Sequence, residues 1–251
     1  METTSSLKRP EAVRLSEGAS SEIAMPRGMP PALAVQGAMV RTRRGQSLPL
    51  SLDGEETVFV VRAGALMLRV TLPHDLRQVV TLLYPGDVFR AAFAPPAAAA
   101  HLSAASAGEV LRFRFGTFAA LAASEPAIAR YVDEAVAKQT ARQAIHLATV
   151  GRLDCLQRLA TFLTELALTT GVRAPCGGLA FEMPLSRTDL ADYLGLNPDT
   201  LSRTISRLRA TGLLSHPERH RALIRDFEAL AALTPAARSL QALCGGTEAS
   251  V

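Results

Sequence analysis

The chain of 251 residues contains only three cysteines, and none of them lies before residue 155. Cys155, Cys176 and Cys244 are far apart and lack the paired spacing of a disulfide framework or a metal site. Because iron–sulfur clusters are held by several cysteine thiolates, this distribution excludes such a cluster near the N-terminus. Isolated cysteines are typical of a reducing compartment, so we expect a cytoplasmic protein.

Long apolar runs are missing as well. The alanine-rich stretch 91–107 is interrupted by Pro95, Pro96 and His101, so no membrane-spanning segment is expected. The N-terminus has no apolar core of the kind that a secretory signal requires. Residues 1–32 are polar and rich in proline, and they predict a disordered tail. The small residues of 234–251 predict a second tail.

Residues 33–125 contain short runs rich in Val, Leu and Phe that are separated by Gly, Pro or Asp. The clearest runs are 58–62, 65–71, 78–83 and 110–115. This spacing predicts an antiparallel β-roll or barrel. An enzyme built on such a roll would need clustered histidine or carboxylate metal ligands on its strands. These runs contain no histidine, so we do not expect an enzyme.

A long helix is predicted for residues 126–153, because Glu125-Pro126 suits a helix start and the period then continues to about Arg152. Residues on one stripe of this helix recur every three or four positions and form what we call the seam. The seam consists of Ala129, Val132, Val136, Thr140, Gln143, Leu147 and Val150. Such a stripe predicts pairing with the same helix of a second copy, in a homodimer. The alternative is packing against the helix's own roll.

The C-terminal unit, residues 154–233, contains two short helices joined by a tight turn between Ser186 and Gly212. Gly195 suits a left-handed helix end, Asn197 suits an N-cap, and Pro198 suits the first helical position. The second helix places Leu201, Ile205 and Leu208 at the core-facing period. This pattern predicts a helix–turn–helix.

The outer face of the second helix is polar and basic, which suits the major groove of double-stranded DNA. A short hairpin follows and predicts a wing whose arginines contact phosphates. Residues 186–225 contain seven arginines against four acids. The alternative is a solvated surface helix pair. The residues predicted to contact DNA are Ser186, Arg187, Thr188, Asp199, Thr200, Ser202, Arg203, Ser206, Arg207, Arg219 and Arg221.

The order of roll, long helix, hinge at Leu153–Asp154 and winged helix–turn–helix resembles the Crp–Fnr superfamily of bacterial transcription regulators. The resemblance covers about residues 39–233. It implies an α+β fold with an N-terminal antiparallel β-roll like a cyclic-nucleotide-binding domain, a long dimerisation helix and a C-terminal winged helix–turn–helix. It also implies a sequence-specific transcription regulator, an activator that contacts RNA polymerase.

The segment 188–203 resembles the Fnr and FixK branch, which usually shows Asp-Ile-x-x-Tyr-Leu-Gly-Leu followed by Glu-Thr-x-Ser-Arg. In that branch the Glu, Ser and Arg read the half-site TTGAT of a palindrome. The matching positions here are Asp199, Ser202 and Arg203. Aspartate is one methylene shorter than glutamate, so its base contact is lost or redirected.

The signal that the roll would sense is left open by the resemblance. A cyclic-nucleotide pocket needs Gly-Glu for the ribose and Arg-Ser or Arg-Thr for the phosphate, and neither pair follows Phe89. Relatives that use haem bind it in this domain, and the candidate axial ligands here are His74, His101 and His146. Cys155 or Cys176 could instead act as a redox switch. We expect a regulator of the FixK type, without a cofactor and controlled by its own abundance.

Overall fold

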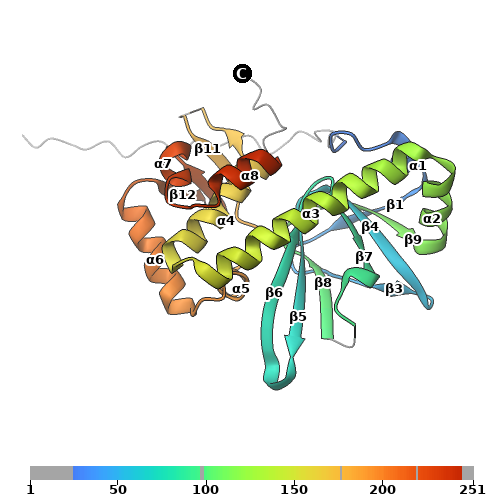
Figure 1. Ribbon diagram of the computed structural model, residues 1–251, viewed down its shortest axis with the longest axis horizontal. Helices are drawn as coiled ribbons and strands as arrows, with labels where there is room; N and C mark the ends of the chain where they lie inside the picture. The colour runs from blue at the N-terminus through green and yellow to red at the C-terminus, as the bar shows by residue number, and fades with distance from the viewer. Residues whose placement is uncertain (1–24, 97–98, 176, 219, 245–251) are drawn as a thin grey trace, which may run out of the picture.

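The computed structural model describes residues 25–96, 99–175, 177–218 and 220–244. A β-roll and a C-terminal helical unit lie at opposite ends of one long helix (Figure 1). The elements of the roll are α1 (Pro31–Gln36), β1 (Ala38–Thr42), β2 (Ser47–Leu48), β3 (Ser51–Leu52), β4 (Glu55–Ala63), β5 (Leu66–Leu72), η1 (Pro73–Asp75), β6 (Leu76–Leu83), β7 (Val88–Arg90), η2 (Ala91–Phe93), β8 (Ala99–Ala104), β9 (Gly108–Arg114) and α2 (Phe115–Ser124).

The roll consists of two antiparallel sheets. One has the strand order β1-β9-β4-β3, with β7 paired to β4, and the other has the order β2-β8-β5-β6. Alternate side chains of a strand point to opposite faces, and the inward residues of both sheets meet in one core. Phe59, Leu68, Phe89 and Leu102 are almost fully buried there. The predicted α+β fold with an antiparallel roll is confirmed.

Two features of the roll differ from the prediction. β8 lies inside the alanine-rich stretch, because Leu102 and Ala104 fill the core between the sheets although alanine has a low intrinsic strand propensity. Ordered chain also begins within the predicted N-terminal tail. Met29 and Leu33 are buried against Phe113 of β9, and α1 starts at residue 31. The rest of that predicted tail, residues 1–24, lies outside the described residues.

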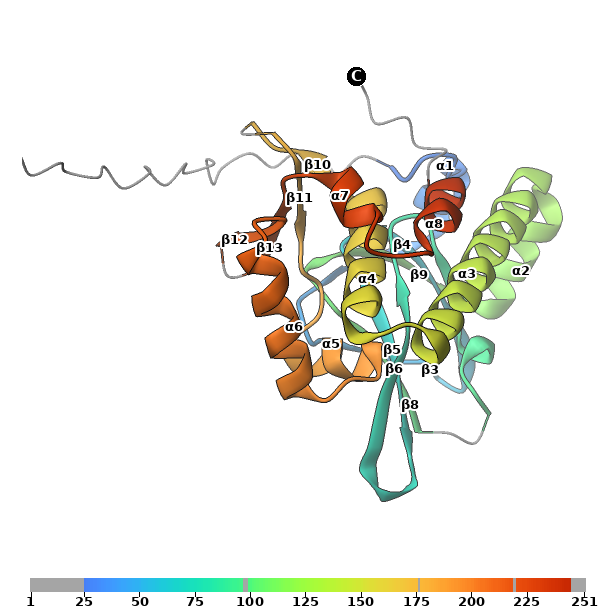
Figure 2. The same ribbon diagram turned by 60° about the vertical axis from the view of Figure 1, so that its left-hand side comes forward.

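The remaining elements are α3 (Pro126–Arg152), α4 (Cys155–Thr170), β10 (Val172–Arg173), β11 (Leu179–Glu182), α5 (Arg187–Leu194), α6 (Pro198–Ala210), β12 (Leu214–Glu218), β13 (Arg221–Ile224), α7 (Phe227–Ala231) and α8 (Ala237–Cys244). α4 lies between α6 and α3 (Figure 2). α8 corrects the predicted C-terminal tail. Its residues Leu240 and Cys244 are buried because the helix packs on α3 and α4, whose apolar sides it covers.

The predicted hinge coincides with a break between two helices. α3 ends at Arg152, Leu153 is extended, and Asp154 begins α4. The Asp154 carboxylate accepts the Gln157 backbone N–H at 2.9 Å, while the Gln157 side chain accepts the Asp154 N–H at 3.2 Å. Such a reciprocal pair satisfies helix N–H groups that otherwise lack a partner, so α4 starts anew and does not continue α3.

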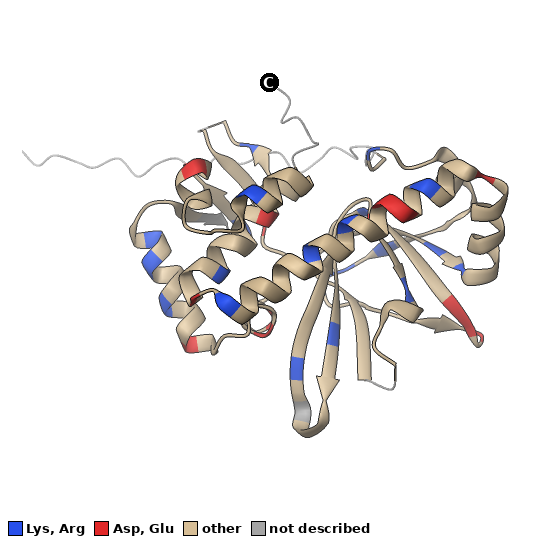
Figure 3. Cartoon of the chain, in the orientation of Figure 1, with Lys and Arg blue, Asp and Glu red and all other residues tan. Residues whose placement is uncertain are grey.

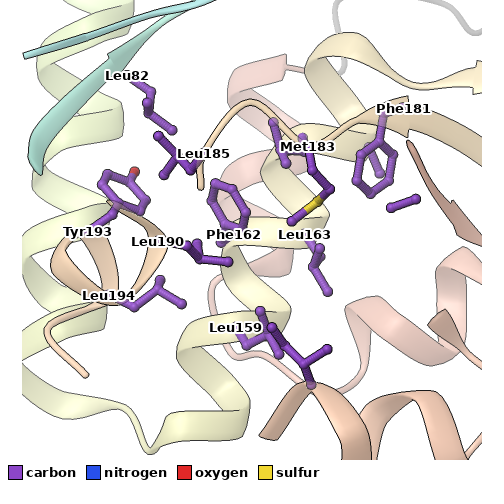
Figure 4. Close-up of a cluster of buried hydrophobic side chains, with 14 of the residues drawn as sticks. Leu82, Leu159, Phe162, Leu163, Phe181, Met183, Leu185, Leu190, Tyr193 and Leu194 are labelled. Atoms are coloured by element: carbon purple, nitrogen blue, oxygen red, sulfur yellow. The ribbon is translucent and has the colours of Figure 1, made fainter. Parts of the chain in front are cut away.

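The roll and the C-terminal unit share a continuous hydrophobic core. Figure 4 shows Leu82 of β6 beside Leu185 and Tyr193, in the same cluster as Phe162 of α4. All four residues are at most 6% exposed. The unit is therefore packed onto the roll as well as joined to it through the hinge.

Candidate nucleic-acid interface

The local sequence explains the shape of the helix–turn–helix. The Ser186 side chain caps α5 by accepting the Asp189 N–H at 3.1 Å. Gly195 ends α5 with φ 60° and ψ 42°, a left-handed conformation that glycine adopts without steric cost. The Asn197 side chain then caps α6 by accepting the Asp199 N–H at 2.9 Å, and Pro198 follows at the first helical position. The roles of Gly195, Asn197 and Pro198 match the sequence prediction, whereas the Ser186 cap was not predicted.

α6 has one buried face and one exposed face. Leu201, Ile205 and Leu208 are at most 3% exposed and pack into the shared core. Thr200 is half-buried. The predicted contact residues of α6 that are exposed are Asp199, Ser202, Arg203, Ser206 and Arg207. In Figure 1, α6 lies at the end of the molecule farthest from the roll, so this face is open to a large partner.

Positive charge gathers on this helix. Figure 3 shows basic positions following one another along α6. Partial burial and the nearby Arg209 guanidinium lower the pKa of Arg187, which begins α5. Two cations held close together favour an anion between them, such as a backbone phosphate. Arg209 was not among the predicted contact residues, although it stands on the polar side of the helical period. Ser186 and Thr188 are exposed beside Arg187.

The predicted wing is a β-hairpin. β12 and β13 pair in antiparallel register, with Glu218 opposite Arg221, and β13 also pairs with β11. Arg221 is exposed. Arg219, the other predicted phosphate contact of the wing, lies outside the described residues. The wing thus extends from a sheet that is anchored in the core through Ala222 and Ile224.

The roll holds the first helix of the motif through ion pairs that the sequence gives no signal for. Arg69 of β5 lies 2.6 Å from the Asp189 carboxylate, and Arg77 of β6 lies 3.3 Å from that of Asp192. Both acids belong to α5. Their pairing neutralises negative charge that would otherwise repel DNA phosphates. Because these partners are more than 100 residues apart in the chain, periodicity does not reveal them.

The predicted seam lies beside the face of α3 that packs on the roll. Ile128, Tyr131 and Ala135 are buried on that packed face. In the seam, Leu147 is 75% exposed and Gln143 is also exposed, whereas four other seam residues are half-buried. The seam residues that are half-buried are Ala129, Val132, Val136 and Val150. The Thr140 hydroxyl donates to the Val136 carbonyl at 2.9 Å, so this polar group has a partner within its own helix.

A cavity of about 250 Å³ lies between α3 and the roll. Its lining combines apolar and uncharged polar side chains and consists of Leu68, Thr81, Leu83, Phe89, Phe93, Val136, Gln139, Thr140 and Gln143. Arg90, which follows the lining residue Phe89 in sequence, does not line it. Its guanidinium pairs with Glu56 at 3.1 Å and lies 4.0 Å from the centre of the Phe115 ring.

The candidate haem ligands are dispersed. His74 and His101 are exposed, at the β5–β6 turn and on β8. His146 stacks on the Tyr193 ring at 4.0 Å between centroids, and burial lowers its pKa to about 4. Within the described ranges, no three His, Cys, Asp or Glu side chains lie close enough to hold a metal ion. No helix among these residues is long and apolar enough to cross a membrane.

Of the two candidate redox cysteines, only Cys155 lies among the described residues. Cys155 is half-buried in the first turn of α4, and Cys176 lies outside the described residues. Cys244 of α8 is buried, and burial raises the pKa of its thiol. A raised pKa lowers the thiolate fraction and so makes Cys244 unreactive.

Comparison with known proteins gives matches along most of the chain. Residues 157–233 match the Crp-like helix-turn-helix domain family. The chain is 30% identical over 181 residues to the nitrogen fixation regulation protein FixK of Azorhizobium caulinodans, which covers 70% of each protein. It is 26% identical over 189 residues to the transcriptional activator protein FnrL of Cereibacter sphaeroides, which covers 74% of this chain and 76% of FnrL.

The fold is also that of a solved regulator. The structure of FixK2 from Bradyrhizobium japonicum matches with a TM-score of 0.65 and 25% identity, over 80% of this chain and 98% of that one. These relatives are regulators and not enzymes, in agreement with the prediction from the sequence that this chain is not an enzyme. The sequence similarity to FixK and the structural similarity to FixK2 lead to the same assignment as the exposed helix–turn–helix. The chain therefore belongs to the Crp–Fnr family of DNA-binding transcription regulators.

Proposed function

We propose that this regulator acts as a homodimer that reads a two-fold symmetric DNA site with one α6 helix in each half-site. The observation that carries the proposal is the exposure of two surfaces at once, the polar face of α6 and the part of the seam formed by Thr140, Gln143 and Leu147. A two-fold axis along the seam would present the two α6 helices to successive major grooves, about 34–36 Å apart.

Within each half-site, Asp199, Ser202 and Arg203 are the proposed base readers. All three are exposed on α6. An arginine can donate two hydrogen bonds to the major-groove edge of guanine, and a carboxylate accepts from the amino group of cytosine or adenine. We infer a TTGAT-like half-site and expect any departure from the FixK pattern at the base facing Asp199, since aspartate reaches less far than glutamate.

Selection of duplexes from a random pool tests the proposed function. The full chain is incubated with the pool at physiological salt, and bound duplexes are amplified and sequenced while sedimentation gives the mass of the complex. We expect a palindrome with TTGAT-like halves bound by two chains. A chain that stays monomeric on DNA, or selects no palindrome, would contradict the proposal.

We propose that the regulator works without a cyclic nucleotide or another cofactor. The cavity beside α3 has no cationic side chain in its lining to pair with a phosphate. None of its lining residues is a histidine, cysteine, methionine or tyrosine that could ligate haem. The alternative is a haem-gated or small-molecule-gated regulator of the same family, which would use another site or a rearranged one.

Absorption spectroscopy separates these two possibilities. We expect the purified chain, reconstituted with haemin and passed through a desalting column, to show no Soret band. A retained band that disappears in His74→Ala, His101→Ala or His146→Ala would support the gated alternative and identify the ligand. Cyclic AMP is likewise expected to leave the thermal midpoint of the chain unchanged.

We further propose transcription activation through contact with RNA polymerase. The names of FnrL, a transcriptional activator, and of FixK, a regulator of nitrogen fixation, support this direction. In a cofactor-free regulator the amount of protein sets the occupancy of the operator, so the signal would act on synthesis or degradation. The proposed place of action is the cytoplasm, where the chromosome of a bacterium lies.

Arg219→Ala is expected to weaken binding to all duplexes by a similar factor, because a wing arginine would contact phosphates and no base. The slope of log affinity against log salt should fall by about one counterion per chain. Titrations of the selected palindrome and of an unrelated duplex at several salt concentrations measure both effects. A loss confined to the palindrome would instead assign base reading to Arg219.

A further inference from the structure

Three parts of the molecule meet at one buried cluster of charges. Arg142 of α3 forms an ion pair with Asp87, which follows β6 in the roll. Its Nε also lies 3.8 Å from the Oε1 atom of Glu165, on α4 of the DNA-binding unit. The side chains of these residues are only 6%, 4% and 8% exposed. Arg142 thus connects the roll, the long helix and the DNA-binding unit.

The groups around the cluster are largely neutral at physiological pH. Tyr84 of the roll lies with its ring 5.2 Å from the Arg142 guanidinium, and its backbone N–H donates to Asp87 at 2.8 Å. Tyr193 of α5 is buried and has a raised pKa, chiefly because of desolvation. The other facing groups are His146 and Lys138 of α3 and Cys244 of α8.

The charges of the cluster do not balance when every group is ionised. Two carboxylates face one guanidinium, and Lys138 acts on the cluster only at longer range. Asp87 accepts hydrogen bonds from Arg142 and from Tyr84, whereas Glu165 has the longer contact with Arg142. The extra proton is therefore best placed on Glu165. Desolvation raises the pKa of Glu165 to about 7.

We propose that Arg142, Asp87 and Glu165 position the DNA-binding unit against the roll and α3, and that proton uptake by Glu165 strengthens this docking. Burying a carboxylate without its own cation costs far more free energy than burying a neutral carboxyl group. Since α4 packs against α6, looser docking lets the recognition helix leave the orientation that one operator requires. The inference rests on the proposed paired reading of that operator.

The direction of the pH effect follows from the two states. In the docked state the pKa of Glu165 is about 7, and in a solvated state it returns towards its ordinary value of 4.5. The docked state therefore holds the proton at higher pH, and its advantage declines as pH rises from 4.5 towards 7 and then levels off. Between pH 6 and pH 8, one such group changes the docking equilibrium by up to about tenfold.

The test compares operator binding by the parent and by Glu165→Gln, an isosteric variant that stays neutral. Histidine is the side chain that most often changes charge near neutral pH, so both proteins also carry His216→Gln and His220→Gln. We expect the parent to bind the selected palindrome more weakly at pH 8 than at pH 6, by up to about tenfold for each chain of the dimer. Glu165→Gln should keep its pH 6 affinity at pH 8, while binding to an unrelated duplex changes equally in both proteins.

Asp87→Asn provides a second variant, since Glu165 then becomes the acid that pairs with Arg142. Its pH profile should shift to lower pH, which a purely structural role of Asp87 would not produce. Parallel profiles for the parent and Glu165→Gln would overturn the inference.

Thermal unfolding provides a readout that needs no DNA. Glu165→Gln should exceed the parent in thermal midpoint by about 3–5 °C more at pH 8 than at pH 6. If this shift is present but no palindrome is bound at any pH, the proposed function fails and the proton-dependent docking remains. If the midpoints of the two proteins follow pH in parallel, the docking inference fails alone.

Discussion

Leu147→Asp is expected to convert the regulator to a monomer and to weaken binding to its palindrome by at least about 100-fold. Leu147 is a large apolar side chain that is 75% exposed in the isolated chain. In a symmetric dimer along the seam, this leucine and its copy would be buried together. Two aspartates in the same place would be desolvated without cations and would repel each other.

The loss on DNA is large because a monomer engages one half-site at a time. In the dimer the second α6 binds at the high effective concentration set by the first, and this gain disappears with the dimer. Sedimentation at micromolar concentration and titration of the palindrome measure the two effects. Affinity for an unrelated duplex should change much less.

Ala148→Asp is the matched control for this substitution. Residue 148 is also exposed, but it lies about 100° further round the helix and points away from the seam. It receives the same charge at almost the same position along α3, so effects on helix propensity and net charge are shared. If Ala148→Asp dissociates the protein as fully as Leu147→Asp, or if neither does, the seam is not the dimer interface.

Arg203→Ala is expected to cost about 1–3 kcal/mol in each half-site of the palindrome, a loss of about 5- to 150-fold in affinity per half-site. Arg203 is exposed near the middle of α6, one turn after Asp199. Its planar fork can bridge two acceptors of one guanine, which a shorter side chain leaves unsatisfied. The preference for the palindrome over a scrambled duplex should decrease by the same factor.

Arg203→Lys separates base reading from simple charge. Lysine retains the positive charge and hence the salt dependence, but it lacks the fork that binds both acceptors. We expect Arg203→Lys to lose most of the sequence preference while keeping the affinity for an unrelated duplex. Equal binding of every duplex by Arg203→Ala and the parent would show that another residue reads the site.

Local signals in the sequence were sufficient for the helix–turn–helix. Gly195, Asn197 and Pro198 each act within a few residues of their own position, through backbone conformation or a cap. The spacing of the apolar residues in α6 likewise predicts directly which face of the helix is buried. The exposed face then follows by exclusion, and its basic residues indicate the partner. For the same reason α3 could be predicted from residue 126 to residue 152.

Features that depend on distant partners were not predictable in this way. β8 is a strand because β2 and β5 pair with it, and its alanine-rich sequence alone favours no strand. α8 and α1 are short, and each is ordered by the larger surface on which it packs. In the sequence of α3, Arg142 looks like any other polar residue. Its buried partners, Asp87 and Glu165, lie far from it in the chain, so the sequence pattern does not reveal the ion pairs.

The common core of roll and DNA-binding unit restricts how the two could be exchanged between relatives. Leu82 and Val79 of the roll are buried in one cluster with residues of α4 and α5, and α5 packs on β6. A chimera that combined this roll with the DNA-binding unit of another protein would place different side chains against that apolar surface. Joining the two parts at residue 153 would not restore the packing. Evolution of a new DNA preference is therefore easier through the outer face of α6 than through replacement of the whole unit.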